Sequence, residues 1–340
     1  MGGVTHTDRN DKSSVSFVLF VNEAVDLFLD YTVYDGFAAN TYYYDRVIIN
    51  AVEPPTFSPT ELPTLSPTDS LSEVIAQNFN LQLMEAYLVF ARLLDEIEGP
   101  GPFTLFTPHD PGWERLPEGW EAKLRNQAWG AQLQYIMRTH IVTGDFPVDD
   151  LEETQDFTTT SGQVVTVTRL PDTERVRVDN ILAISLFDAS NGFAYMLDDV
   201  LLPDWLDETL EDVMATSFAA MLALIEQAEL DDLLRDAEST LTIFVPTDEA
   251  LESATLDAPL EDVLRYHFVD DGPYPAMYFR TRSLPTLFQE EEIELDTSTS
   301  PPKLVGALND AAIMETDVVA NNGLIHVIDA VLAPPNFPEA

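Results

Sequence analysis

The strongest constraint on the fold of this chain is an internal repeat. Four blocks recur in one order and at similar spacing: residues 71–76, 104–108, 138–142 and 191–203 match residues 210–215, 242–246, 265–269 and 322–334. A repeat of this length marks tandem copies of one structural unit. The spacing between the second and third blocks is longer in the first copy, which places an insertion around residues 117–130, where we expect a loop.

The repeat divides the 340 residues into four parts: an upstream segment at 1–52, a linker at 53–68, a first domain at 69–204 and a second domain at 205–336. The upstream segment weakly echoes the second copy, so we expect a degenerate or truncated unit. The linker repeats the pattern Pro-Thr-x-Ser-Pro-Thr. Its prolines favour an extended polyproline II spacer. Its Ser and Thr residues are typical of an O-glycosylated stalk and equally of an unmodified linker.

Each copy begins with helical periodicity and ends with strand patterns. Residues 210–225 place apolar side chains at three- and four-residue steps, which predicts helix, whereas residues 241–245 are typical of a buried strand. Thr247 is positioned to cap the next helix. Asn322-Gly323 separates two apolar runs and predicts a tight hairpin with positive φ angles. Helices first and strands later predict an α+β fold: in each copy a compact β-sandwich or wedge packed with several α-helices.

Two motifs of the second copy resemble conserved blocks of the fasciclin-like domain family. They are Phe-x-Pro-Thr-Asp and Asn-Gly-x-Ile-His-x-Ile-Asp, and the first copy repeats both in altered form. We expect structural roles at these motif positions: Phe106, Pro108, His140, Asn191, Gly192, Phe244, Pro246, Thr247, Asp248, Asn322, Gly323, His326 and Asp329. The resemblance covers about residues 69–335, and residues 1–52 would be a partial remnant of the same family.

Between the two motifs lies the Tyr-His pair of the family, Tyr266-His267, followed by Phe268. The resemblance implies that these three residues contact a partner. The alternative is that His267 is a buried, hydrogen-bonded residue that joins a helix end to the sheet. His140 is expected to be its counterpart in the first copy.

Two replacements in the first copy and one pair of residues in the second copy qualify the motif pattern. Thr139 and Tyr195 replace the tyrosine of the pair and the histidine of the second motif in the first copy, which puts binding by that copy in doubt. His326 and Asp329 lie three residues apart on a predicted strand, so we expect them to face opposite sides of the sheet.

The family resemblance implies a non-enzymatic protein that acts in cell adhesion or matrix binding, at the cell surface or outside the cell. Its partner would be a cell-surface protein, a matrix protein or a polysaccharide, and no cofactor is implied. The chain contains no clear signal peptide and no apolar run long enough to span a bilayer. An enzyme with an unrecognised site remains as a remote alternative.

Composition restricts the partners further. The chain has 60 acidic and 16 basic residues, a formal charge of −44, which opposes binding to nucleic acid. It lacks cysteine, and none of its five histidines stands at zinc-binding spacing, so we predict no metal centre and no catalytic residue. Runs of carboxylates suit weak calcium association. An acidic, calcium- or mineral-associated matrix protein is therefore the second functional hypothesis.

Overall fold

The computed structural model describes residues 68–170, 175–236, 240–254, 258–289 and 291–335, preceded by the backbone of six short strands. These strands pair antiparallel, β1 with β2, β3 with β6 and β4 with β5. Their bounds are β1 Gly2–Thr7, β2 Ser14–Leu19, β3 Asp26–Leu27, β4 Asp30–Tyr34, β5 Ala39–Tyr43 and β6 Val47–Ile48. That residues 1–52 are a remnant copy stays a prediction, and linker residues 53–67 lie outside the described residues.

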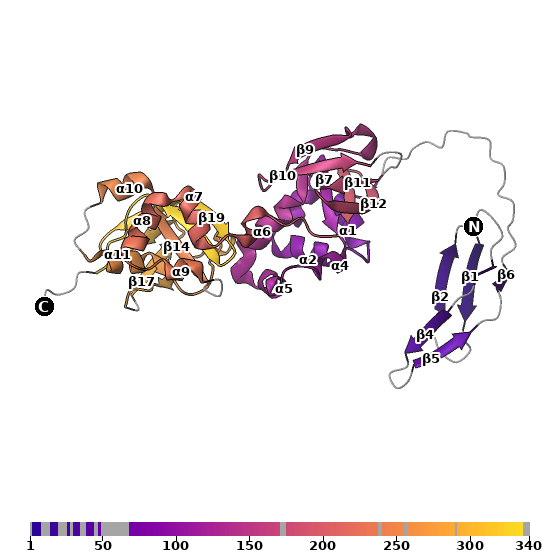
Figure 1. Cartoon of the computed structure of the whole chain (residues 1–340), viewed down its shortest axis with the longest axis horizontal. Coiled ribbons are helices and arrows are strands. Elements are labelled where there is room, and N and C mark those ends of the chain that lie inside the picture. The colour runs from indigo at the N-terminus through magenta and orange to yellow at the C-terminus, as the bar shows by residue number, and fades with distance from the viewer. Residues whose placement is uncertain are drawn as a thin grey trace. The chain divides into compact units, whose positions relative to one another are not determined.

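The first repeat folds into domain 1, in which short helices precede and cover a sheet (Figure 1). Its helices are α1 Leu71–Ala76, α2 Gln82–Phe90, α3 Leu94–Glu98, α4 Asp110–Trp113, α5 Trp120–Leu124 and α6 Gly130–Thr139, with 3-10 turns η1 Gln127–Trp129 and η2 Val148–Asp150. Its strands are β7 Phe103–Pro108, β8 Ile141–Thr143, β9 Thr154–Thr158, β10 Val164–Arg169, β11 Val176–Val178, β12 Ile181–Ala189 and β13 Gly192–Leu197.

The 3-10 turn η3 Asp204–Asp207 connects domain 1 to domain 2, the second repeat. The helices of domain 2 are α7 Leu210–Ser217, α8 Ala219–Gln227, α9 Asp232–Arg235, α10 Asp248–Ser253 and α11 Leu260–Tyr266, with a 3-10 turn η4 Ala276–Tyr278. Its strands are β14 Leu241–Pro246, β15 Phe268–Val269, β16 Arg282–Pro285, β17 Glu292–Asp296, β18 Lys303–Val305, β19 Asp310–Ala320 and β20 Gly323–Ile328.

The two domains share one sheet topology, which confirms the predicted repeat and the α+β class. The strand order is β8-β7-β13-β12-β11-β10-β9 in domain 1 and β15-β14-β20-β19-β18-β17-β16 in domain 2. The pairs β7·β13 and β14·β20 are parallel, and the other pairs of both sheets are antiparallel. Register shifts within β12 and β19 mark bulges, and bulges bend a strand. The long strands β12 and β19 can therefore serve both parts of a folded-over sheet.

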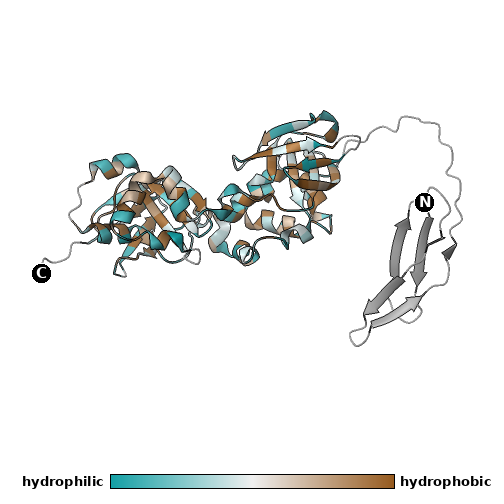
Figure 2. Ribbon diagram, in the orientation of Figure 1, coloured by the Kyte–Doolittle hydropathy of each residue, from teal (hydrophilic) through white to brown (hydrophobic). Residues whose placement is uncertain are grey.

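Each domain buries two apolar clusters, one between the helices and the sheet and one among the strands. In domain 2 the first contains Leu210, Ile225 and Phe268, whereas the second contains Phe244 and Tyr266. Figure 2 colours the same ribbon by hydropathy and shows hydrophobic and hydrophilic residues interspersed along the helices and strands of both domains. Among the described residues, every helix is too short or too polar to cross a bilayer.

The insertion of the first copy is helical, so the predicted loop at residues 117–130 is wrong. Residues 120–124 form α5, and η1 follows before α6 begins. The physical reason lies in the spacing of Trp120 and Leu124, which four residues apart occupy the same face of a helix. Both side chains are buried, as is Trp129. Domain 2 passes from α10 to α11 without a counterpart of α5 among its described residues.

The predicted hairpin between β19 and β20 is confirmed, but its Asn-Gly pair joins the sheet to the helices and lacks the predicted positive φ angles. Asn322 and Gly323 are absent from the residues with positive φ, so the pair does not supply the expected turn conformation. Instead the buried amide of Asn322 accepts the N–H of Leu210 at 2.8 Å and donates to the carbonyls of Leu234 at 2.9 Å and Asp236 at 3.0 Å. One side chain therefore fastens the hairpin tip to the ends of α7 and α9.

Domain 1 repeats this arrangement around Asn191. Its amide accepts the N–H of Leu71 and donates to the carbonyls of Ile97 and Gly99, each at 2.8 Å. The glycine that follows is required for close approach, because a Cβ at Gly192 or Gly323 would collide with a backbone carbonyl of the neighbouring strand. The Asn-Gly motif therefore attaches the sheet to the helices and allows neighbouring strands to pack closely.

We predict that Asn322→Ala lowers the free energy of unfolding by about 3 kcal/mol, because it takes the side-chain partner from the buried N–H of Leu210 and the buried carbonyl of Leu234 and also removes the bond to Asp236. Urea denaturation followed by far-UV circular dichroism measures the change. Asn321→Ala is the matched control, since its side chain makes no such bonds to the helices, and we expect it to change stability little. Equal effects of the two substitutions would contradict the role of Asn322.

Candidate functional site

The candidate site consists of Tyr266, His267 and Phe268, at the junction of α11 and β15. Helix α11 ends because its last turn meets the sheet, where Phe268 pairs with Ile243 of β14. All three side chains are buried, with at most 1% of their surface exposed. The residues that the family resemblance assigns to partner binding therefore lie inside domain 2.

His267 links α11 to the segment that follows the last strand. Its Nδ1–H donates to the carbonyl of Val263 at 2.7 Å, and its Nε2 accepts the N–H of Leu332 at 3.0 Å. A neutral imidazole satisfies both bonds, whereas a second ring proton would face the amide proton of Leu332. Burial lowers the pKa of His267 from 6.5 to about 4, in agreement with a neutral ring.

His140 makes the same two bonds in domain 1. Its Nδ1–H donates to the carbonyl of Ile136 at 2.8 Å, and its Nε2 accepts the N–H of Leu201 at 3.0 Å. Burial lowers its pKa to about 4 as well. The equivalence predicted for His140 and His267 thus extends to each ring nitrogen.

Tyr266 holds the loop between β18 and β19. Its hydroxyl accepts the N–H of Ala307 at 3.0 Å and donates to the carbonyl of Glu292 at 3.4 Å. Thr139 stands in its place in domain 1, where its hydroxyl donates to the carbonyl of Tyr135 at 3.0 Å. The replacement therefore removes the link from the helix end to that loop.

His326 is buried on β20 between aromatic rings. Its ring lies 5.6 Å from the ring of Phe244 and 5.1 Å from that of Phe279. Its Nε2–H donates to the carbonyl of Tyr274 at 3.0 Å, and its Nδ1 accepts the N–H of Asp317 at 3.2 Å. His326 is therefore the opposite neutral tautomer to His267, and burial lowers its pKa to about 4.

Tyr195 takes the place of His326 in domain 1 and performs the same task. Its hydroxyl donates to the carbonyl of Phe146 at 2.5 Å, and Phe146 occupies the position of Tyr274 in the repeat. Burial raises the pKa of Tyr195, so its proton is retained. By residue type alone, Tyr195 differs from the histidine of the second domain. The hydrogen bond that the two residues share becomes visible only in the structure, because it depends on how far each side chain reaches.

Two carboxylates near His326 have different surroundings. The half-buried Asp317 accepts the N–H of Ala276 at 2.9 Å, and desolvation raises its pKa to about 6. Asp329 is exposed and accepts the N–H of Ala312 at 2.6 Å. His326 is buried on β20, whereas Asp329 follows the end of that strand and is exposed, so the two side chains lie in different surroundings. Nothing in the sequence pattern singles out Asp317.

The remaining motif positions lie on or beside the parallel strand pairs. Phe106 and Pro108 belong to β7 and Phe244 and Pro246 to β14, and both strands are buried. The side chain of Thr247 accepts the N–H of Ala250 at 3.2 Å, which confirms the predicted cap of α10.

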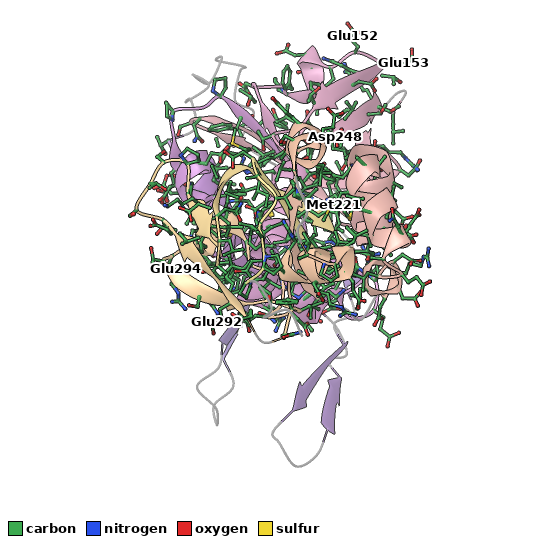
Figure 3. The ribbon with its side chains drawn as sticks, turned by 90° about the vertical axis from the view of Figure 1, so that its left-hand side faces the viewer. Glu152, Glu153, Met221, Asp248, Glu292 and Glu294 are labelled. Atoms are coloured by element: carbon green, nitrogen blue, oxygen red, sulfur yellow. The ribbon has the colours of Figure 1, made fainter. Side chains whose placement is uncertain are left out.

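Acidic side chains supply much of the outer surface. Asp248 is exposed in the first turn of α10, and Glu152, Glu153, Glu292 and Glu294 extend outward from the ribbon (Figure 3). Within the described residues, no three histidine, aspartate or glutamate side chains are grouped as metal ligands would be. The calcium hypothesis therefore rests on diffuse charge.

Comparison with known proteins identifies the repeated unit. A sequence model described as Fasciclin domain matches residues 80–203 and again residues 216–334. The chain belongs to the fasciclin domain family. The family predicted from the two motifs is thereby confirmed, and both copies are fasciclin domains.

Several relatives match this chain over most of its length. Transforming growth factor-beta-induced protein ig-h3 of Oryctolagus cuniculus is 26% identical over 259 residues, which cover 72% of this chain and 36% of that protein. Stabilin-2 of Mus musculus is 26% identical over 275 residues, covering 70% of this chain and 10% of that protein. The chain thus spans about a third of the first relative and a tenth of the second.

A solved structure is also similar. It is a FAS1 domain pair from the insect cell adhesion molecule Fasciclin I, with 19% sequence identity and a TM-score of 0.39. The match covers 74% of this chain and 96% of that chain.

We predict that acidification from pH 7.5 to pH 5.5 lowers the free energy of unfolding by about 1 kcal/mol for each buried histidine. The unfolded chain binds protons below pH 6.5, whereas the folded histidines bind them only near pH 4. Their stabilisation is complete above pH 6.5 and is lost as the pH falls toward 4. Urea denaturation at both pH values measures the loss.

Asp317 acts in the opposite direction, because its folded pKa lies above the unfolded value and its protonation near pH 6 favours the folded state. Asp317→Asn removes this compensation, so we expect a steeper loss of stability in that variant. Stability that stays constant or rises between pH 7.5 and pH 5.5 would contradict buried neutral histidines.

Proposed function

We propose that this protein is a non-enzymatic adhesion or matrix-binding protein, located at the cell surface or outside the cell, that acts through the outer surfaces of its two fasciclin domains. The observation that carries the proposal is the burial of the motif residues within a confirmed family. His140, His267 and His326 are neutral, and both nitrogens of each ring are occupied by backbone groups.

The same burial argues for binding in place of catalysis. A general base must reach the proton of a substrate, and a nucleophile must reach its carbonyl or phosphorus atom. The three buried histidines have no surface with which to meet a substrate. Activity in surface recognition is compatible with this arrangement, because it requires exposed side chains held on a rigid fold.

Charge indicates the chemistry of the partner. With a net charge of −44, the surface attracts basic proteins and cations. The exposed pairs Glu152-Glu153 and Glu292 with Glu294 illustrate this (Figure 3). They support a basic cell-surface or matrix protein as the partner, and they also favour the second candidate, association with a calcium-bridged polysaccharide or mineral matrix.

We test the proposal by measuring binding of the full chain to cells and extracellular matrix of its source organism. A basic protein partner predicts binding that persists with a calcium chelator and weakens as salt rises, since exposed charge pairs are screened. Binding abolished by the chelator would select the calcium-bridged alternative. Absence of binding with and without calcium would contradict an adhesive role, provided that circular dichroism shows the chain to be folded.

In this proposal, Tyr266 contributes to partner binding indirectly. Because its ring is buried, Tyr266 acts by holding Ala307, and the next residue, Leu308, exposes 55% of its surface. The hydroxyl thereby positions an apolar side chain that a partner can contact. Domain 1, with Thr139 at this position, lacks that support.

We predict that Tyr266→Phe weakens binding several-fold without unfolding domain 2, because it removes the hydroxyl and leaves the ring in place. Binding to the matrix preparation and the urea midpoint are measured together. Tyr274→Phe, which removes a hydroxyl bond to Tyr278 in the same domain, is the matched control. If the parent chain and the Tyr266→Phe variant bind equally well, the hydroxyl of Tyr266 plays no part in binding.

A further inference from the structure

The helical insertion of domain 1 lies against the β19–β20 hairpin of domain 2. Lys123 of α5 donates from Nζ to the backbone carbonyl of Asn321, at the hairpin tip, over 2.9 Å. The same ammonium group lies 4.9 Å from the ring centre of Trp120 and 4.2 Å from that of Trp129. Such cation–π contacts orient the lysine toward the hairpin and stabilise its partly buried charge.

Gln132 of α6 provides a second attachment to the hairpin. Its buried side chain donates from Nε2 to the carbonyls of Ala320 at 3.2 Å and Gly323 at 2.9 Å. Its Oε1 has no hydrogen-bond partner among the described residues, so the contact depends on the donor group. Two side chains of domain 1 therefore bind three backbone carbonyls at the hairpin tip.

Apolar contacts surround these hydrogen bonds. Val319 and Leu324, which flank the tip, belong to the same buried cluster as the helices of domain 1. The connecting turn η3 is also fixed there, because Trp205 packs 5.6 Å from the ring of Trp120 and 5.8 Å from that of Tyr135. The junction is thus a continuous packed interface.

A second strip of contacts involves η4 of domain 2. Arg92 donates to the carbonyl of Met277 at 2.8 Å, and its guanidinium lies 4.9 Å from the ring centre of Tyr278. Gly130 begins α6 where any Cβ would crowd Met277 and Tyr278. Asp317 holds the N–H of Ala276 at the start of η4 and so supports this strip from within domain 2.

The two sides of the interface are not interchangeable, because neither domain carries the contact residues of the other. In domain 1, the exposed Asp188 and Ser190 stand at the repeat positions of Val319 and Asn321. A carboxylate at the apolar position would have to be buried without a partner. Domain 2, in turn, has no counterpart of α5 among its described residues.

We propose that the α5–η1 insertion and the start of α6 lock the two fasciclin domains into one rigid body, with Lys123 of α5 and Gln132 of α6 as the residues that specify the pairing. Domains within one chain commonly move relative to each other unless a large packed interface prevents it. The lock fixes the separation of the two outer surfaces. This inference concerns the geometry of the pair and holds whatever the partner is.

The absence of cysteine allows a direct test in the full chain. Thr158→Cys and Glu294→Cys place one spin label on an exposed strand position of each domain. Double electron–electron resonance then gives the distribution of distances between the labels. We expect one narrow distribution in the parent, and one about twofold broader or more after Gln132→Glu, which sets a carboxylate against two carbonyls, or after Lys123→Met.

Two controls separate loss of the lock from general loss of stability. Gln134→Glu alters a glutamine of α6 that bonds within domain 1 to Ala91, and Arg125→Met alters the exposed residue that follows α5 and pairs with Glu121. We expect narrow distributions in both. A parent distribution as broad as that of the variants, or no broadening after either Gln132→Glu or Lys123→Met, would overturn the proposal.

Discussion

The structure of each domain depends on a neutral histidine buried between a helix end and the segment that follows the last strand of the domain. His267 joins α11 to Leu332, and His140 joins α6 to Leu201. These bonds cross the boundary between the helical layer and the sheet, where regular secondary structure supplies no hydrogen bonds of its own. This attachment fixes how helices and strands meet in each domain.

Asparagine provides a second attachment, directly before the last strand of each domain. Asn191 and Asn322 each use both amide atoms to hold two helix ends, and a glycine follows because the neighbouring strand leaves no room for a Cβ. The family motifs are therefore explained by attachment between layers. The parts of the surface that remain for recognition are the loops and strand faces on which carboxylates dominate.

The sequence predicts a structural feature well when the interactions that stabilise this feature are local. The repeat and the helix-then-strand order predict the α+β fold, and the cap at Thr247 depends only on neighbouring residues. The sequence around residues 120–124 predicts a loop, whereas the structure has a helix, because this short helix is stabilised by burying Trp120 and Leu124 against distant residues. The roles of Gln132 and Asp317 depend on contacts with residues far away in the sequence, so no local sequence pattern predicts them.

Tyr195 illustrates the same limit from the other direction. As a sequence change it departs from the family, yet its hydroxyl reaches the carbonyl of Phe146 as the imidazole of His326 reaches that of Tyr274. A change of residue type can thus preserve an interaction. The change from tyrosine to Thr139, by contrast, removes the bond that Tyr266 makes to Ala307, so the two domains are expected to contribute unequally to binding.

The central claim is that the histidines of the motifs are buried, neutral and saturated with hydrogen bonds, which leaves recognition to the outer surface. Nuclear magnetic resonance of the nitrogen-labelled imidazoles tests it most directly. We predict Nδ1–H tautomers for His140 and His267, an Nε2–H tautomer for His326, and no protonation of the three rings as the pH falls from 7.5 to 5.5. A motif histidine that titrates near pH 6.5 in the folded protein would contradict the claim.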